Sequence, residues 1–152
     1  MKLQVYHGQR LYLANNGDKV VQDSTAIDWK FENSSNNTIV DPTTCNVPVR
    51  IIDRVTGKCL QSQSLFPVET EKRQVFLAPI QIDNQSQFWI FEAVPNYPRW
   101  FFIVNQMPEK NGTRNLCLDV ACERENGNAE IITYHKKRSN AKTKNQWWAL
   151  VP

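Results

Sequence analysis

The sequence predicts an all-β protein made of three copies of one structural unit, and three observations support this. The tripeptide Gln87-Phe88-Trp89 recurs as Gln146-Trp147-Trp148, and a degraded form, Ile27-Asp28-Trp29, stands near the start. The closing tryptophans are separated by 60 and then by 59 positions. Short apolar segments with a period of two alternate with turn signals, which is typical of β-strands. Because self-similarity at a fixed period indicates a repeat architecture, we expect equivalent strands in each copy.

The composition is that of one ordinary globular domain. The chain has 152 residues, 22% of them charged, and a net charge of +3, and its length is ample for a single core. We therefore expect one domain over 1–152, with copies one, two and three at about 1–46, 47–97 and 98–152. No apolar run approaches the roughly 20 residues of a membrane span. The net charge is also low for a nucleic-acid-binding protein.

Strand and turn signals follow each other through all three copies. The strand signals are Leu3/Val5, Val49/Ile51, Val75/Leu77, Trp89/Phe91, Ile103 and Trp148/Leu150. The turn signals are Asn16-Gly17-Asp18, Thr56-Gly57-Lys58, Asn111-Gly112-Thr113 and Asn126-Gly127-Asn128. No stretch has a helical stripe over three turns, and eight prolines discourage long helices. Three copies of about four strands predict a closed pseudo-threefold barrel with a hairpin cap, because closure removes exposed sheet edges.

Copy one is predicted to be shorter than the others. The chain runs 12 positions from Gly17 to Trp29, against 21 from Gly127 to Trp148. The missing segment therefore falls in the loop just before the closing tryptophan. The polar stretch 33–48 that follows is interpreted as a surface connection between copies.

The motifs of copy three resemble those of ricin B-type lectin domains. They are Leu116-Cys117-Leu118-Asp119-Val120, Gly127-Asn128-Ala129 and Asn145-Gln146-Trp147-Trp148, and the likeness extends over nearly the whole chain. The resemblance implies a β-trefoil fold with three pseudo-symmetric repeats, of which the first is shortened. It further implies that the glutamine and tryptophan of each Gln-x-Trp are structural residues and not direct sugar ligands.

The resemblance also implies a carbohydrate site in copy three. Asp119 would accept hydrogen bonds from two adjacent sugar hydroxyls, Tyr134 would stack on the apolar face of the sugar, and Asn145 would bind the same hydroxyls. His135 either closes the site from the side or is an exposed turn residue. These roles suit the groups, because hydrogen bonds to a carboxylate are strong and an aromatic face tolerates C–H groups. The alternative for Asp119 is a turn carboxylate bonded to nearby backbone.

The equivalent positions of the other two copies have lost these side chains. Copy two has Gln61, Ala78 and Ser86 at the acid, aromatic and amide positions. Copy one has Ala14 near the acid position and Ala26 at the amide position, has Ile27 in place of the motif glutamine, and lacks most of the loop. Only copy three therefore keeps an acid, an aromatic ring and an amide together. We expect one sugar site per chain.

The resulting prediction is a lectin for galactose or N-acetylgalactosamine-type glycans, with its site in copy three. Single-site binding is weak, so avidity would come from a homo-oligomer or a larger complex. The alternative is a β-trefoil protein-interaction module, such as a protease inhibitor or a scaffolding subunit, because fold does not fix function. His7 and His135 lie in different copies, and no nucleophile–base pair, phosphate loop or metal cluster is visible. We therefore expect no enzymatic activity, cofactor, metal, nucleic-acid partner or membrane insertion.

Three further features leave alternatives open. The basic run His135-Lys136-Lys137-Arg138, with Lys142 and Lys144, is either a solvated loop or an attraction for acidic or sulfated glycans. Cys45, Cys59, Cys117 and Cys122 permit two disulfides without requiring them, and free thiols are favoured. Residues 1–7 do not resemble a signal peptide, which is compatible with a cytoplasmic protein or with the mature form of a secreted one.

Overall fold

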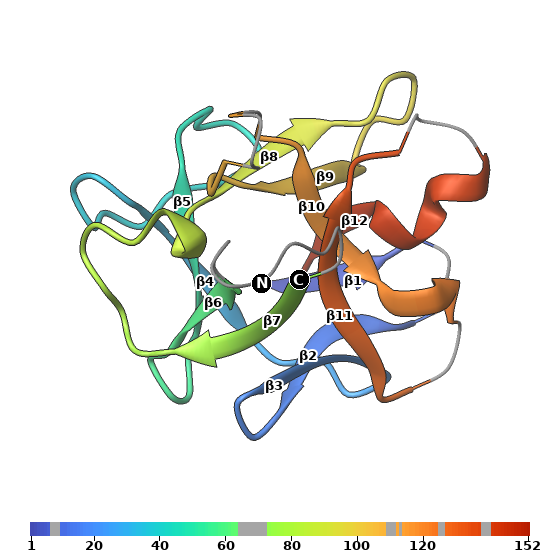
Figure 1. Ribbon diagram of the computed structural model, residues 1–152, viewed down its shortest axis with the longest axis horizontal. Helices are drawn as coiled ribbons and strands as arrows, with labels where there is room; N and C mark the ends of the chain where they lie inside the picture. Colours follow the sequence, from blue (N-terminus) through green and yellow to red (C-terminus); the bar gives the residue numbers. More distant parts are fainter. Residues whose placement is uncertain (7–9, 64–72, 109–111, 113, 125–126, 138–140) are drawn as a thin grey trace.

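Twelve strands and three short 3-10 helices make up the described part of the chain (Figure 1). The computed structural model describes residues 1–6, 10–63, 73–108, 112, 114–124, 127–137 and 141–152. The strands are β1 (Lys2–Val5), β2 (Tyr12–Asn16), β3 (Lys19–Asp23), β4 (Trp29–Asn33), β5 (Val49–Asp53), β6 (Cys59–Ser62), β7 (Arg73–Ala78), β8 (Trp89–Ala93), β9 (Phe101–Asn105), β10 (Leu116–Val120), β11 (Ala129–His135) and β12 (Trp148–Val151). The short helices are η1 (Gln85–Gln87), η2 (Ala121–Glu123) and η3 (Ala141–Gln146). No helix of these ranges has the length and apolarity to span a membrane.

The predicted local elements agree with the structure where it describes them. Every predicted strand segment falls in an observed strand. The predicted turns at Gly17 and Gly57 are confirmed, because both glycines have a positive φ, +64° and +72°, that other residues adopt with strain. Five residues named above lie outside the described residues: His7, Asn111, Thr113, Asn126 and Arg138.

The strands pair antiparallel in one network that closes on itself. From β10 the pairing runs through β11, β3, β2, β1, β12, β9, β8, β5 and β6 to β7, and β4 pairs with β5. The two end strands of this path, β10 and β7, also pair with strands inside it: β10 with β9, and β7 with β3 and β11. These additional pairings close the network. The two chain ends lie side by side (Figure 1), because β1 pairs with β12.

This pairing corrects the fold class predicted from the sequence. The all-β class is confirmed, but the predicted β-trefoil of three pseudo-symmetric repeats is replaced by one closed barrel whose twelve strands share a single hydrogen-bonded network. The physical reason is that pairing crosses the boundaries between copies, as in β4 with β5, β8 with β9 and β1 with β12. Copy one supplies four strands, the number expected for each copy, and its shortening lies in the loop before Trp29, as predicted. Only its connection 24–28 is short, and it carries no 3-10 helix. The division of the single domain at about 1–46, 47–97 and 98–152 stays a prediction.

The three repeated tryptophans are core residues that make the same hydrogen bond. Each opens a strand, is fully buried, and donates its indole Nε1–H to the backbone carbonyl of a buried leucine in the same copy. The pairs are Trp29 with Leu13 at 3.2 Å, Trp89 with Leu60 at 3.0 Å and Trp148 with Leu118 at 3.2 Å. A buried indole N–H needs an acceptor, so this bond fixes the relation between two strands of each copy.

These bonds also define equivalent positions in the three copies. The residue that follows each leucine is Ala14 in copy one, Gln61 in copy two and Asp119 in copy three. The strand register adds a second set, because Cys59 pairs with Ala78 as Cys117 pairs with Tyr134. The alignment of copies two and three that motif spacing predicts is therefore confirmed at the acid and aromatic positions.

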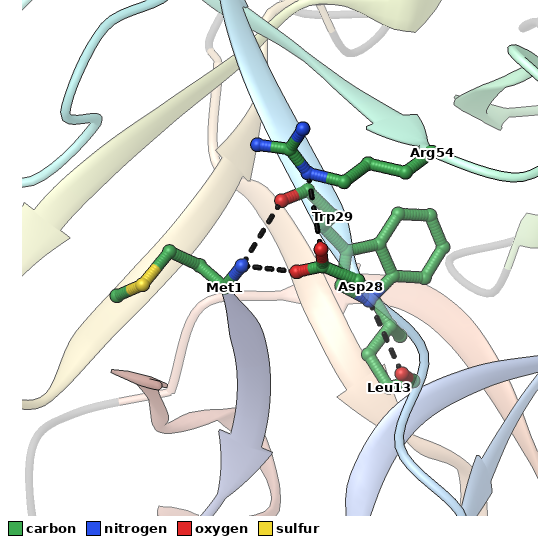
Figure 2. A network of polar contacts seen from close by, with 5 residues as sticks. All are labelled: Met1, Leu13, Asp28, Trp29 and Arg54. Carbon is green, nitrogen blue, oxygen red and sulfur yellow. Dashed lines mark hydrogen bonds and ion pairs between the residues drawn. The ribbon is translucent and has the colours of Figure 1, made fainter.

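Asp28, the middle residue of the degraded motif of copy one, has a structural role (Figure 2). Its carboxylate accepts a hydrogen bond from the Met1 ammonium and pairs with Arg54 Nε at 3.1 Å. The Met1 ammonium also donates to the Trp29 carbonyl at 3.4 Å. The hydrogen bond from the Met1 ammonium, together with the nearby positive charges, holds the pKa of the Asp28 carboxyl below its ordinary value, against the opposing effect of desolvation. In copy one this position therefore ties β1 to β4 and β5.

The four cysteines are free thiols. Cys59 and Cys117 are buried at equivalent places in β6 and β10, Cys45 is half-buried, and Cys122 is exposed. Burial raises the pKa of the Cys59 thiol to about 12 and that of Cys117 well above its ordinary value. The buried pair is therefore protonated and unreactive at neutral pH.

Candidate functional site

Asp119 is the centre of a buried polar cluster that joins β10 to η3. Its side chain is 3% exposed. Oδ1 accepts a hydrogen bond from Asn145 Nδ2 at 2.8 Å, and Oδ2 accepts one from Gln146 Nε2 at 2.8 Å. Asn145 Nδ2 also donates to the Val120 carbonyl at 3.2 Å. Because Asp119 lies inside a strand and binds two side chains from far along the chain, it is more than a carboxylate that stabilises a local turn.

Gln146 connects this carboxylate to the end of β11. The Gln146 side chain is fully buried, and its Nε2 donates to the His135 carbonyl at 2.9 Å as well as to Asp119. Its Oε1 accepts from the backbone N–H of Lys137 at 2.9 Å. The amide thus holds β10, β11 and the start of the following loop in one arrangement.

The strand register places Tyr134 and His135 on opposite faces of β11. Residues directly opposite each other on antiparallel strands share a face, and side chains alternate along each strand. Tyr134 lies opposite Cys117, two residues before Asp119, so Tyr134 and Asp119 share a face. His135 lies opposite Leu116 and so belongs to the other face. Both rings are half-buried, with their centroids 5.7 Å apart.

The structure therefore brings three of the four predicted ligand residues to one face. Asp119 and Asn145 are in direct contact, and Tyr134 shares the face of Asp119. Asn145 Oδ1 is buried and has no hydrogen-bond partner in the part of the chain that the structure describes. An unsatisfied buried carbonyl oxygen is unfavourable, so a hydroxyl donor from a ligand would stabilise it.

Copy two contains the same network with a neutral group in place of the acid. Gln87 Nε2 donates to Gln61 Oε1 at 2.9 Å, as Gln146 donates to Asp119. The other partners of Gln87 also correspond to those of Gln146: Nε2 donates to the Pro79 carbonyl at 2.9 Å, and Oε1 accepts from the Gln81 N–H at 2.9 Å. The local fold therefore forms with an amide at this position and does not require a carboxylate.

The other members of the set differ between the copies as predicted. Ala78 occupies the register position of Tyr134 and offers no ring. Ser86, in the place of Asn145, donates its hydroxyl to Asn84 Oδ1. Copy one has Ala14 at the acid position and so contributes no carboxylate there. Among the described residues, no group of three or more His, Cys, Asp or Glu side chains could hold a metal ion.

Lys137 is the residue near this site that motif analysis did not assign to it. Its Nζ lies 5.8 Å from the centroid of the Tyr134 ring. A cation this close to a ring face is attracted by the ring quadrupole. The basic run indicated positive charge in the region, but the contact depends on how Gln146 holds the Lys137 backbone, which no sequence pattern reports.

Comparisons with known proteins show the fold but not the family. No family model matches the chain, and no curated protein matches it. Among solved structures it is similar to ThreeFoil, a designed threefold-symmetric β-trefoil protein, with a TM-score of 0.70 and 19% identity over 99% of this chain and 96% of that one. It is also similar to a salivary protein from Culex quiquefasciatus of the cysteine and tryptophan-rich family, with a TM-score of 0.61 and 18% identity over 97% and 89%.

A third similar structure is an exo-β-1,3-galactanase from Clostridium thermocellum. The TM-score is 0.68 and the identity 16%, over 99% of this chain and 29% of the enzyme. At such identities the likeness concerns the fold alone. The closed barrel is therefore trefoil-like, and the relation to ricin B-type lectins remains a resemblance of motifs.

Proposed function

We propose that the protein is a carbohydrate-binding lectin with one site, built from β10, β11 and the end of η3. The observation that carries the proposal is the buried carboxylate of Asp119 at a position where Gln61 makes the same hydrogen bond in copy two. An ionised carboxylate is more unfavourable to bury than an amide. Since the scaffold does not need the charge, a ligand contact is the best explanation for it.

A sugar matches the groups that surround Asp119. A carboxylate oxygen accepts more than one hydrogen bond, and Asn145 and Gln146 each donate to one oxygen of Asp119. Two adjacent hydroxyls of a pyranose would supply further donors, and the unsatisfied Asn145 Oδ1 would accept another. The half-buried Tyr134 ring on the same face suits the apolar face of the sugar.

The ligand class that we propose is galactose or N-acetylgalactosamine-type glycans, on the motif resemblance to ricin B-type lectins. We further propose that the protein binds without catalysing a reaction, and that nucleic acid and membrane insertion play no part. One site per chain gives weak monovalent binding, so a homo-oligomer or a larger complex would supply avidity.

The test is Asp119→Asn, measured on a glycan array and by titration calorimetry with galactose and N-acetylgalactosamine. The asparagine removes the charge while its side-chain oxygen still accepts from Gln146, so the variant should fold and lose at least about tenfold in affinity, because hydrogen bonds to a charged group are worth about 1.5–3 kcal/mol. The matched control is Gln61→Asn, the equivalent site in copy two, which should leave binding unchanged.

Two results would overturn the proposal. One is a wild-type protein that binds no glycan, and the other is an Asp119→Asn protein that binds as well as the wild type. In the first case the protein-interaction alternative would be tested next, by titrating serine and cysteine proteases with the chain.

A further inference from the structure

Lys137 is placed on the proposed sugar face by the residue that holds Asp119. Gln146 accepts from the Lys137 backbone N–H at 2.9 Å and donates to Asp119 Oδ2 at 2.8 Å. From this fixed backbone the Lys137 side chain turns back until its Nζ lies 5.8 Å from the Tyr134 ring centroid. The ammonium is therefore at the ring on which a sugar would stack.

Copy two has no cation at the equivalent position. In copy three the backbone N–H of Lys137 donates to Gln146 Oε1. In copy two the corresponding donor to Gln87 Oε1 is the backbone N–H of Gln81, a neutral residue. Copies two and three thus differ at a fourth position of the same face, in addition to the acid, ring and amide positions. Since the backbone hydrogen bond is the same in both copies, the positive charge is no requirement of the loop.

Two more lysines of the basic run and of η3 lie over aromatic rings. Lys136 Nζ lies 5.6 Å from the Phe102 ring centroid and pairs with Glu92 at 2.7 Å. Lys144 Nζ lies 5.2 Å from the Tyr6 ring centroid. Of these three lysines, Lys137 is the one that contacts the proposed stacking ring.

We infer that the ligand of this site is an anionic saccharide, whose carboxylate or sulfate group pairs with Lys137 while its ring stacks on Tyr134. This inference rests on the proposed function. A neutral sugar that stacked on this face of the Tyr134 ring would displace the Lys137 ammonium, and the cation–π contact would be lost. An acidic sugar gains an ion pair in exchange for that contact, which favours it over its neutral counterpart.

The carboxylate of Asp119 does not oppose such a ligand at short range. Asp119 is 3% exposed, and its two oxygens accept from Asn145 and Gln146. It would receive the hydroxyl edge of the sugar, whereas the acidic substituent would lie toward Lys137 beyond the Tyr134 ring. The two charges thus recognise opposite ends of one residue of the glycan.

The experiment compares three probes, galactose, galacturonic acid and galactose 6-sulfate, by titration calorimetry at low and high salt. The wild-type protein should bind at least one acidic probe about twofold to fivefold more tightly than galactose, the range expected for a partly exposed ion pair, and salt should reduce the preference. Lys137→Gln, which introduces the neutral side-chain type found at this position in copy two, should abolish this preference. The matched control is Lys58→Gln, which changes the net charge equally in the β5–β6 turn and should preserve the preference.

The outcomes separate this inference from the proposed function. If no probe binds, the lectin proposal itself fails. If galactose binds through Asp119 but the acidic probes bind no more tightly, or Lys137→Gln keeps the preference, only the anionic ligand is rejected. The two acidic arms tell a carboxylate from a sulfate as the preferred group.

Discussion

Gln146 Nε2 donates a 2.8 Å hydrogen bond to Asp119 Oδ2, and this contact couples the architecture of the barrel to its candidate site. The glutamine belongs to the motif that recurs for structural reasons, and Gln87 repeats its hydrogen bonds in copy two. The difference lies in the partner, an acid in one copy and the amide of Gln61 in the other. The same scaffold therefore holds either a neutral structural contact or a buried charge.

The first prediction is that Gln146→Ala destabilises the protein more than Gln87→Ala. Both substitutions remove a buried amide with three hydrogen bonds, which corresponds to about 2–4 kcal/mol of the free energy of unfolding. Gln146→Ala also leaves the charged Asp119 with one donor fewer, and a buried charge that loses a partner is more unfavourable than a neutral group. Urea unfolding of the two variants measures the difference. Equal losses would contradict a different role for the glutamine in the two copies.

The second prediction concerns the three tryptophans that donate to leucine carbonyls. Substituting any one of them by phenylalanine leaves a buried carbonyl without its donor and a cavity beside it, at a combined cost of about 2–4 kcal/mol. Because the bonds of Trp29, Trp89 and Trp148 measure 3.2, 3.0 and 3.2 Å, the three losses should be similar. Denaturant unfolding of the single variants provides the measurement, and one variant that unfolds like the wild type would refute their equivalence.

Features that recur at a fixed spacing could be predicted from the sequence. The spacing of the closing tryptophans predicted equivalent positions, and the strand register confirms that Asp119 corresponds to Gln61 and Tyr134 to Ala78. A closed barrel was expected because closure removes exposed sheet edges, but the route of closure could not be predicted in the same way. It depends on pairings such as β1 with β12, whose partners lie at opposite ends of the chain, and no local pattern specifies them.

Which side chains share the face of the site was only partly predictable. A shift of one residue along a strand moves a side chain to the other face, so the register assigns Tyr134 and His135 to opposite faces, although their rings are in contact at the end of β11. Motif spacing could not assign these faces, because it does not fix the register in which β11 pairs with β10. The contact of Lys137 with the Tyr134 ring was equally inaccessible, since it depends on a backbone hydrogen bond to Gln146.

The third prediction is that the stability contributed by Asp28 depends on pH. Its carboxyl pKa is lowered in the folded protein by the Met1 ammonium and Arg54 (Figure 2). A lowered pKa means that the contribution is present above the ordinary value of 3.8 and is lost as the pH falls through the folded-state pKa. The melting temperature of Asp28→Asn should thus lie below that of the wild type at about pH 6 and approach it at about pH 2.

Salt provides the control for this prediction. Asp28 is exposed, so the effect should be small and should shrink as ionic strength rises. A difference in melting temperature that is the same at both pH values, or that grows as the solution becomes more acidic, would contradict the assigned ion pairs.

The fourth prediction is that the cysteines of the folded protein differ in reactivity according to burial. The exposed Cys122 should react rapidly with a thiol reagent, the half-buried Cys45 more slowly, and the buried Cys59 and Cys117 only after unfolding. Raising the pH to about 9 should not recruit the buried pair, because burial places the pKa of Cys59 at about 12 and that of Cys117 well above its ordinary value. Counting labelled thiols by mass spectrometry, with and without denaturant, tests this. Labelling of Cys117 without denaturant would show that β10 opens beside Asp119, and the buried carboxylate of the proposed site would then be accessible to water.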